Sequence, residues 1–160
     1  MSFNRRQFSL ALAAAALAPS VGHAQGTRFG SLTETVPDAL GRLDPDAAVA
    51  AGRFEFAGQI TLPSAAQRQR MRSFLQAQLA AFEALPEASL STADRMDRAM
   101  LIAKFQAELW QLDVLREWAW NPSLHNPAAP LDLLLNTAYA PLADRVRALL
   151  PRVAALPAYY

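Results

Sequence analysis

The distribution of glycine constrains the fold of this chain more than any other feature. The six glycines all lie before residue 59, and residues 59–160 contain none. Glycine supplies the positive φ angles that tight β-hairpin turns need, so its absence disfavours a sheet over this stretch. The same stretch is rich in Ala, Leu, Arg and Gln, which favour helix. We therefore predict an all-α fold, an antiparallel helical bundle fragment with one long central helix.

Composition excludes several classes of protein. Of the 160 residues, 52% are apolar and 18% are charged, which is too apolar a mixture for a disordered tail. Lys and Arg number 15 against 14 Asp and Glu, so no basic excess favours nucleic acid as a partner. The chain has no Cys, which excludes disulfides, thiolate zinc sites and a Cys nucleophile.

The first residues have the pattern of an export signal. Arg5 and Arg6 precede a run of nine residues, 10–18, that contains only Leu and Ala. As a helix this run is about 14 Å long against a hydrocarbon core of ~30 Å, so it is too short to span a bilayer. The pattern resembles a twin-arginine translocation signal and predicts export to the periplasm by the twin-arginine machinery. The alternative is a buried Ala/Leu helix of the domain itself.

A cleavage site is expected at the end of this segment. Pro19 ends the Leu/Ala run, and small residues occupy the two positions that a signal peptidase inspects. Cleavage after Ala24 defines a signal peptide over residues 1–24. No membrane-spanning segment is expected in the mature chain.

The mature chain is predicted to divide into a leader and a helical domain. Residues 25–35 are polar, contain glycine and show no apolar period, which predicts a flexible leader. The helical domain is expected over residues 36–160. It begins with short helices near 36–43 and 46–51, followed by a weakly alternating segment over 53–62 that we expect to be extended.

Two long helices follow in the prediction. Ser64 is a candidate cap of the first helix, which Pro86 ends. Ser91, with Asp94 three residues later, resembles a capping box that opens a helix running to about Trp118. Two apolar stripes on this helix predict neighbours on more than one side and a central position. The first stripe consists of Met96, Ala99, Met100, Ala103, Ala107, Trp110, Val114 and Trp118, and the second of Leu101, Phe105, Leu109 and Leu112.

Shorter helices complete the prediction. Prolines in residues 121–130 indicate an ordered loop, and helical spacing resumes over 131–137 and 141–150. Pro157 has the position of a helix start rather than of a chain end. We therefore expect the domain to be truncated at its C-terminal end, which would leave the second stripe uncovered.

No constellation of catalytic residues is recognisable, and we assign no catalytic, cofactor-binding or metal-binding residue. After cleavage His125 is the single histidine, whereas a hydrolytic zinc site takes at least two imidazoles, so we expect a surface or loop-pinning role. Asp113 and Glu117 lie four residues apart on one helix face, where ion pairing is favoured over catalysis. Trp110, Trp118 and Trp120 are candidates for an aromatic wall of a binding groove, but the helical spacing of Trp110 and Trp118 favours core positions for these two.

Five stretches, taken in their order along the chain, resemble a known family. They comprise residues 46–54, the helix that Ser64 begins, and residues 91–97, 115–122 and 142–157. The most specific pieces are Arg-Glu-Trp at 116–118 with Asn-Pro at 121–122, and the closing Leu-Pro at 156–157. Together they resemble the amino-terminal portion of the domain-of-unknown-function 885 family, whose members look related to zinc-dependent peptidases.

The resemblance implies a function for longer proteins and carries no catalytic residue to this chain, because the family's His-Glu…His zinc signature lies beyond the part that matches. We therefore expect an exported helical amino-terminal segment of a zinc-peptidase-like protein, without activity of its own. Zinc is implied only for full-length relatives, and the expected partners are a missing C-terminal region or a second copy. The alternative is a complete small periplasmic helical module that binds a protein or peptide at the Trp110/Trp118 face.

Overall fold

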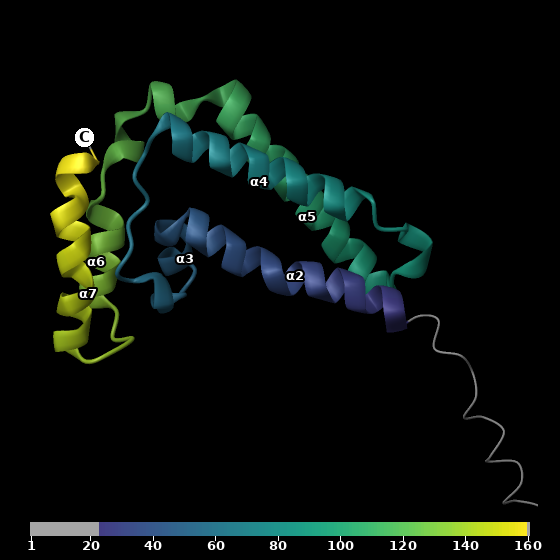
Figure 1. Cartoon of the computed structure of the whole chain (residues 1–160), viewed down its shortest axis with the longest axis horizontal. Helices are drawn as coiled ribbons and strands as arrows, with labels where there is room; N and C mark the ends of the chain where they lie inside the picture. The colour runs from purple at the N-terminus through teal and green to yellow at the C-terminus, as the bar shows by residue number, and fades with distance from the viewer. Residues whose placement is uncertain (1–22, 160) are drawn as a thin grey trace, which may run out of the picture.

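A computed structural model describes residues 23–159, and within them it contains helices and turns but no strand (Figure 1). The predicted all-α class is confirmed. The α-helices are α2 (His23–Leu43), α3 (Pro45–Ala50), α4 (Ala65–Glu83), α5 (Thr92–Trp110), α6 (Ala128–Asn136) and α7 (Leu142–Ala155). Short 3-10 turns lie at Phe54–Phe56, Glu87–Ser89, Glu117–Ala119, Pro122–His125 and Leu156–Ala158, and a π-helical turn at Gln111–Leu115.

The caps predicted for the two long helices are confirmed. Ser64 Oγ accepts a hydrogen bond from the backbone N–H of Gln67 at 3.0 Å, at the start of α4. Ser91 Oγ accepts one from the N–H of Asp94 at 3.1 Å, at the start of α5. Each bond satisfies one of the amide donors that a helix leaves without a partner at its first turn.

The first part of the core joins α2, α4 and α5, and we call it the α2–α4–α5 cluster. Its centre is formed by aromatic rings, with Phe82 of α4 lying 5.9 Å from Phe29 of α2 and 5.8 Å from Phe105 of α5 between ring centroids. Leu75 of α4 and Val36 of α2 are buried beside them. Helix α4 contacts both α2 and α5 and therefore holds this cluster together.

The second part of the core joins α3, α6, α7 and the Phe54–Phe56 turn, and we call it the α3–α6–α7 cluster. Val49, Phe56, Leu134 and Leu149 are buried in it. Figure 1 shows α6 and α7 at one end of the molecule, with α2, α4 and α5 extending away from them. The two clusters thus occupy different ends of the described chain.

Helix α2 connects the two ends, and Gly41 marks the place where it passes the second cluster. A Cβ at Gly41 would lie 2.7 Å from Cε2 of the Phe56 ring and 3.3 Å from the Cβ of Ala48. Such a contact is too short for a side chain, so the absence of one at Gly41 allows Phe56 to pack against the helix.

The structure differs from the prediction at the amino-terminal end. A flexible leader was expected over residues 25–35, but these residues lie inside α2. Phe29 explains the difference, because its ring is buried against Phe82 and this burial stabilises the helix despite the polar residues around it. The predicted short helix over 36–43 is the last part of the same helix.

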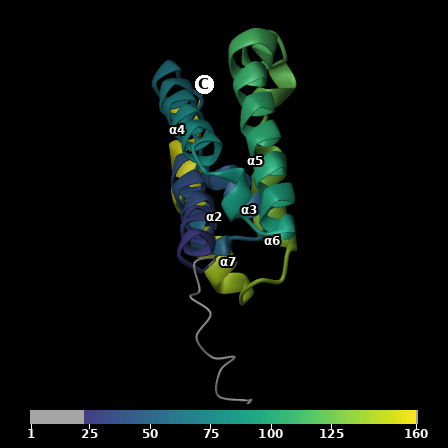
Figure 2. The ribbon, with the colours of Figure 1, turned by 90° about the vertical axis from the view of Figure 1, so that its right-hand side faces the viewer.

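The long helix predicted from residue 92 to Trp118 is also shorter than expected and is not central. Its α-helical part ends at Trp110, and Arg116 adopts a left-handed conformation with φ of 52° after the π-helical turn. Phe105 is the residue of α5 that is fully buried, and Figure 2 shows α5 at the edge of the molecule. Helix α2, with 21 residues, is longer than α5, which has 19.

Smaller differences concern the connections. The segment expected to be extended from residue 53 begins with the Phe54–Phe56 turn. Helix α6 starts at Ala128, before the predicted 131, and α7 continues through Pro151 to Ala155. No helix among the described residues combines the length and the apolar character needed to cross a membrane.

Candidate functional site

An exposed apolar stripe lies on α5 and the turn after it. We call it the α5 seam; it consists of Met96, Met100, Ala103, Ala107, Trp110 and Val114. All six are exposed, with 69% of the surface of Met100 and 52% of that of Trp110 accessible. Large apolar side chains gathered in one exposed row mark an interaction surface more often than single exposed ones do.

The opposite stripe of α5 is the one that packs inside the molecule. Phe105 is buried, and Leu101 and Leu109 pack against the α2–α4–α5 cluster. Truncation was expected to leave this second stripe uncovered, and that prediction is wrong: the uncovered residues are those of the first stripe. The sequence showed two apolar faces but did not show which of them α4 covers.

The turn after α5 separates the two tryptophans that were considered as one face. Trp118 turns back toward the bundle, where its Nε1 donates to the carbonyl of Leu112 at 3.1 Å. The guanidinium carbon of Arg68, in α4, lies 3.8 Å from the centre of the Trp118 ring. Arg68 covers this ring, whereas Trp110 is exposed in the α5 seam. The core position favoured for Trp110 is therefore wrong.

The two carboxylates considered as a pair are bound to separate partners. Asp113 accepts a hydrogen bond from Nε of Arg72 at 2.8 Å, and its hydrogen bond to this side chain raises the pKa of Arg72. Glu117 accepts from Nδ2 of Asn121 at 2.6 Å. The left-handed Arg116 interrupts the helix between them. Ion pairing, which the sequence favoured over catalysis, is confirmed for Asp113.

His125 has the loop-pinning position that was expected. Its Nε2 lies 3.0 Å from the carbonyl oxygen of Trp118. A shallow pocket of about 210 Å³ adjoins it, lined by Trp118, Ala119, Trp120, Asn121, Pro122 and His125. Within residues 23–159, no three His, Asp or Glu side chains gather closely enough to hold a metal ion.

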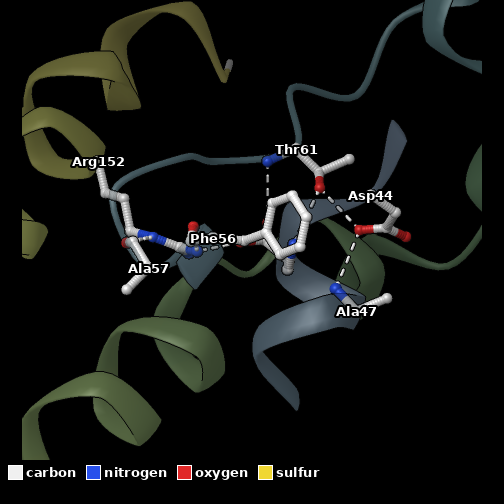
Figure 3. A network of polar contacts seen from close by, with 7 residues as sticks. Asp44, Ala47, Phe56, Ala57, Thr61 and Arg152 are labelled. Atoms are coloured by element: carbon white, nitrogen blue, oxygen red, sulfur yellow. Dashed lines mark hydrogen bonds and ion pairs between the residues drawn. The ribbon is translucent and has the colours of Figure 1, made fainter. Parts of the chain in front are cut away.

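A buried arginine, which the sequence analysis missed, holds the second cluster together (Figure 3). Arg152 of α7 has no accessible surface, and its Nε donates to the carbonyl of Ala57 at 2.6 Å. It also forms an ion pair with Asp46 at the start of α3. The other oxygen of Asp46 accepts from the backbone N–H of Thr61 at 3.1 Å, and Thr61 Oγ1 donates to Asp44 at 2.7 Å. These bonds fix α7 and α3 to the segment between them, which is a structural role.

A second exposed apolar row lies on α7. It consists of Leu142, Val146, Leu150 and Val153, all of them exposed. The side of α7 that faces the core carries Leu149 and Arg152 instead. The molecule therefore has two helices, α5 and α7, with an apolar face that no described residue covers fully.

The predicted export signal lies mostly outside the described residues. This applies to Arg5, Arg6 and the whole Leu/Ala run. Ala24, after which cleavage is expected, lies in the first turns of α2. The signal peptide and its cleavage site stay predictions.

The fold and this surface define an all-α helical protein with open apolar faces. The chain belongs to the family of bacterial proteins of unknown function, DUF885, whose model matches residues 45–160. The predicted family is thereby confirmed. No curated protein matches the chain.

A solved structure gives a second comparison. The chain is similar to a candidate lipoprotein of unknown function from Shewanella oneidensis, with 29% sequence identity and a TM-score of 0.79. The match covers 82% of this chain and 24% of the other. The chain thus spans about a quarter of the length of this relative.

Proposed function

We propose that this chain is the exported amino-terminal helical segment of a zinc-peptidase-like DUF885 protein and has no catalytic activity by itself. The observation that carries the proposal is the exposed α5 seam, a surface of the kind that a larger fold buries. The family match over residues 45–160 and the short share of the solved relative that is covered agree with it. The description of that relative as a candidate lipoprotein favours an envelope location.

The described residues do not fit a zinc site of their own. A hydrolytic zinc ion takes three protein ligands, most often with at least two histidines. His125 is directed at the carbonyl of Trp118, and Asp113 and Glu117 are held by Arg72 and Asn121. In this proposal zinc binds in the part of the longer family proteins that has no counterpart in this chain.

The catalytic part of the proposal is tested with the purified chain. Residues 25–160 are supplied with zinc, and zinc binding and peptide cleavage are measured by calorimetry and with a fluorogenic peptide mixture. We expect neither stoichiometric binding nor cleavage. Cleavage that a chelator abolishes would contradict the proposal.

The export part is tested by cell fractionation. Changing Arg5→Lys and Arg6→Lys together should retain the chain in the cytoplasm, because the twin-arginine machinery recognises the arginine pair. Arg28→Lys, which lies beyond the predicted cleavage site, is the matched control and should leave export intact. Unchanged periplasmic delivery of the double variant would remove the twin-arginine hypothesis.

A second candidate function is a complete periplasmic module that binds a protein or peptide. The exposed Trp110 and the pocket beside Trp118 favour it. Thermal unfolding combined with sedimentation separates the two candidates. A chain that stays monomeric before and during unfolding would favour the module, whereas a chain that aggregates through its open apolar faces would favour the segment of a larger fold.

A further inference from the structure

We propose that the α5 seam is the docking surface for one amphipathic helix. This helix comes from the part of the longer DUF885 proteins that has no counterpart in this chain. This inference rests on the proposed function and names the partner of that surface. The partner presents a row of apolar side chains and packs across α5, with its closest approach between Ala103 and Ala107.

The spacing of the seam fits a single helix as partner. Its residues follow one another at intervals of four, three, four, three and four along the chain. This alternation is the heptad pattern that keeps one row of side chains facing one neighbouring helix. From Met96 to Trp110 the α-helical part of the row is about 21 Å long at 1.5 Å per residue, so the contact extends over about four turns, and Val114 follows in the π-helical turn.

The sizes of the side chains indicate where the two helices cross. Ala103 and Ala107 form the middle of the seam, with Met100 and Trp110 on either side of them. Helices packed at an angle approach most closely at their crossing point and diverge away from it. Small residues at the centre allow the close approach, and the Met and Trp side chains fill the widening space at the ends.

Two of the charges beside the seam are already matched within the chain. Lys104 forms an ion pair with Glu108, and Asp113 is bound by Arg72. The partner helix therefore needs no charged residue to neutralise them, and apolar contact supplies the attraction.

A helix of the same fold is favoured over a second copy because the solved relative has about three quarters of its chain outside the match, which is enough further chain to provide the helix. Charge does not decide between the two partners, since Lys104 stays paired with Glu108 within each chain.

The test compares the same substitution in a short and a long protein. In this chain Ala103→Glu should leave the melting temperature unchanged and reduce binding of a hydrophobic dye, since the residue faces solvent. In the Shewanella oneidensis protein, Glu at the residue that superposes on Ala103 should lower the melting temperature by ~5 °C or more, because a charge would be buried there. The matched control in this chain is Ala77→Glu, on the exposed face of α4. In the longer protein the control is Glu at the residue that superposes on Ala77.

Leucine in place of the same residue keeps the test decisive if the glutamate variant of the longer protein does not fold. The added volume should destabilise the longer protein and leave this chain unaffected. Equal behaviour of the seam and control variants in the longer protein would overturn the proposal. A dimer of this chain that Ala103→Glu dissociates would overturn it in favour of a second copy. Zinc-dependent cleavage by this chain alone would instead overturn the proposed function and leave these measurements unaffected.

Discussion

The two clusters of the core are held together in different ways. In the α2–α4–α5 cluster the rings of Phe29, Phe82 and Phe105 meet, and none of the charged residues whose burial the structure describes is buried there. In the α3–α6–α7 cluster the largest fully buried side chain is that of Arg152, which bonds to groups about a hundred residues earlier in the chain. The first cluster follows from helical periodicity, whereas the second depends on polar bonds between distant segments.

The largest effect is expected at the centre of the first cluster. Phe82→Ala should lower the free energy of unfolding by about 3–5 kcal/mol, because it removes a buried ring that touches two other helices. Urea denaturation measures the change. Leu150→Ala, at an exposed position of α7, is the control and should change the stability by less than about 0.5 kcal/mol. Equal effects of the two variants would show that the ring packing is not what holds this cluster.

A somewhat smaller effect is expected from the buried arginine of the second cluster. Arg152→Met keeps most of the side-chain volume but leaves the Ala57 carbonyl and one oxygen of Asp46 without their partner, which should cost about 3 kcal/mol. Arg147→Met, on the exposed side of the same helix, is the matched control and should be nearly neutral. A stable Arg152→Met variant would mean that apolar contact alone suffices in this cluster.

The difference between the clusters explains which parts of the fold were predictable. The caps at Ser64 and Ser91 follow from local patterns, and these predictions are confirmed. Which side of α7 faces the core was not predictable, because its apolar row of Leu142, Val146 and Leu150 faces outward while Arg152 faces the core. The periodicity of apolar residues locates an apolar face of a helix. It does not reveal partners far away in the sequence, such as the Ala57 carbonyl and Asp46, which allow Arg152 to be buried.

The surface was predictable to a similar extent. Two apolar stripes on the helix from residue 92 were recognised, and an exposed stripe was expected. The prediction of which stripe is exposed was wrong, because this depends on which face of α5 packs against α4. The predicted end of the helix was also wrong, because no proline or glycine marks the actual end at Trp110. The π-helical turn and the left-handed Arg116 that end it have no local signal in the sequence.

A smaller loss of stability is expected when the helix caps of the two clusters are removed. Ser91→Ala should lower the free energy of unfolding by about 1 kcal/mol, since Ser91 caps α5 and has no partner in another helix. Asp44→Ala should cost more, about 2 kcal/mol, because Asp44 caps α3 through Ala47 and also accepts from Thr61. Thermal and urea unfolding of both variants measure the difference. Equal costs would indicate that the bond to Thr61 adds nothing.

The smallest effect is a dependence on pH at the edge of the second cluster. The hydrogen bond from its own backbone N–H is the largest cause that lowers the pKa of Glu55; burial opposes it, and Arg53 lowers the pKa further. Because the pKa is lower in the folded chain, the stabilisation is present above the unfolded pKa and is lost as the pH falls through the folded one. The melting temperatures of wild type and Glu55→Gln should therefore differ at pH 7 and converge in acid. A difference that is independent of pH would assign the effect to another cause.

Helix α2 makes the two ends of the molecule a single unfolding unit. Its Phe29 and Val36 belong to one cluster, and at Gly41 it lies under the Phe56 ring of the other. Amide protons in the middle of α2 are then released to solvent only when the whole chain opens, so their exchange rates report the global stability. Through this shared helix we expect damage at either end to lower the stability of the other, so the two ends should melt together.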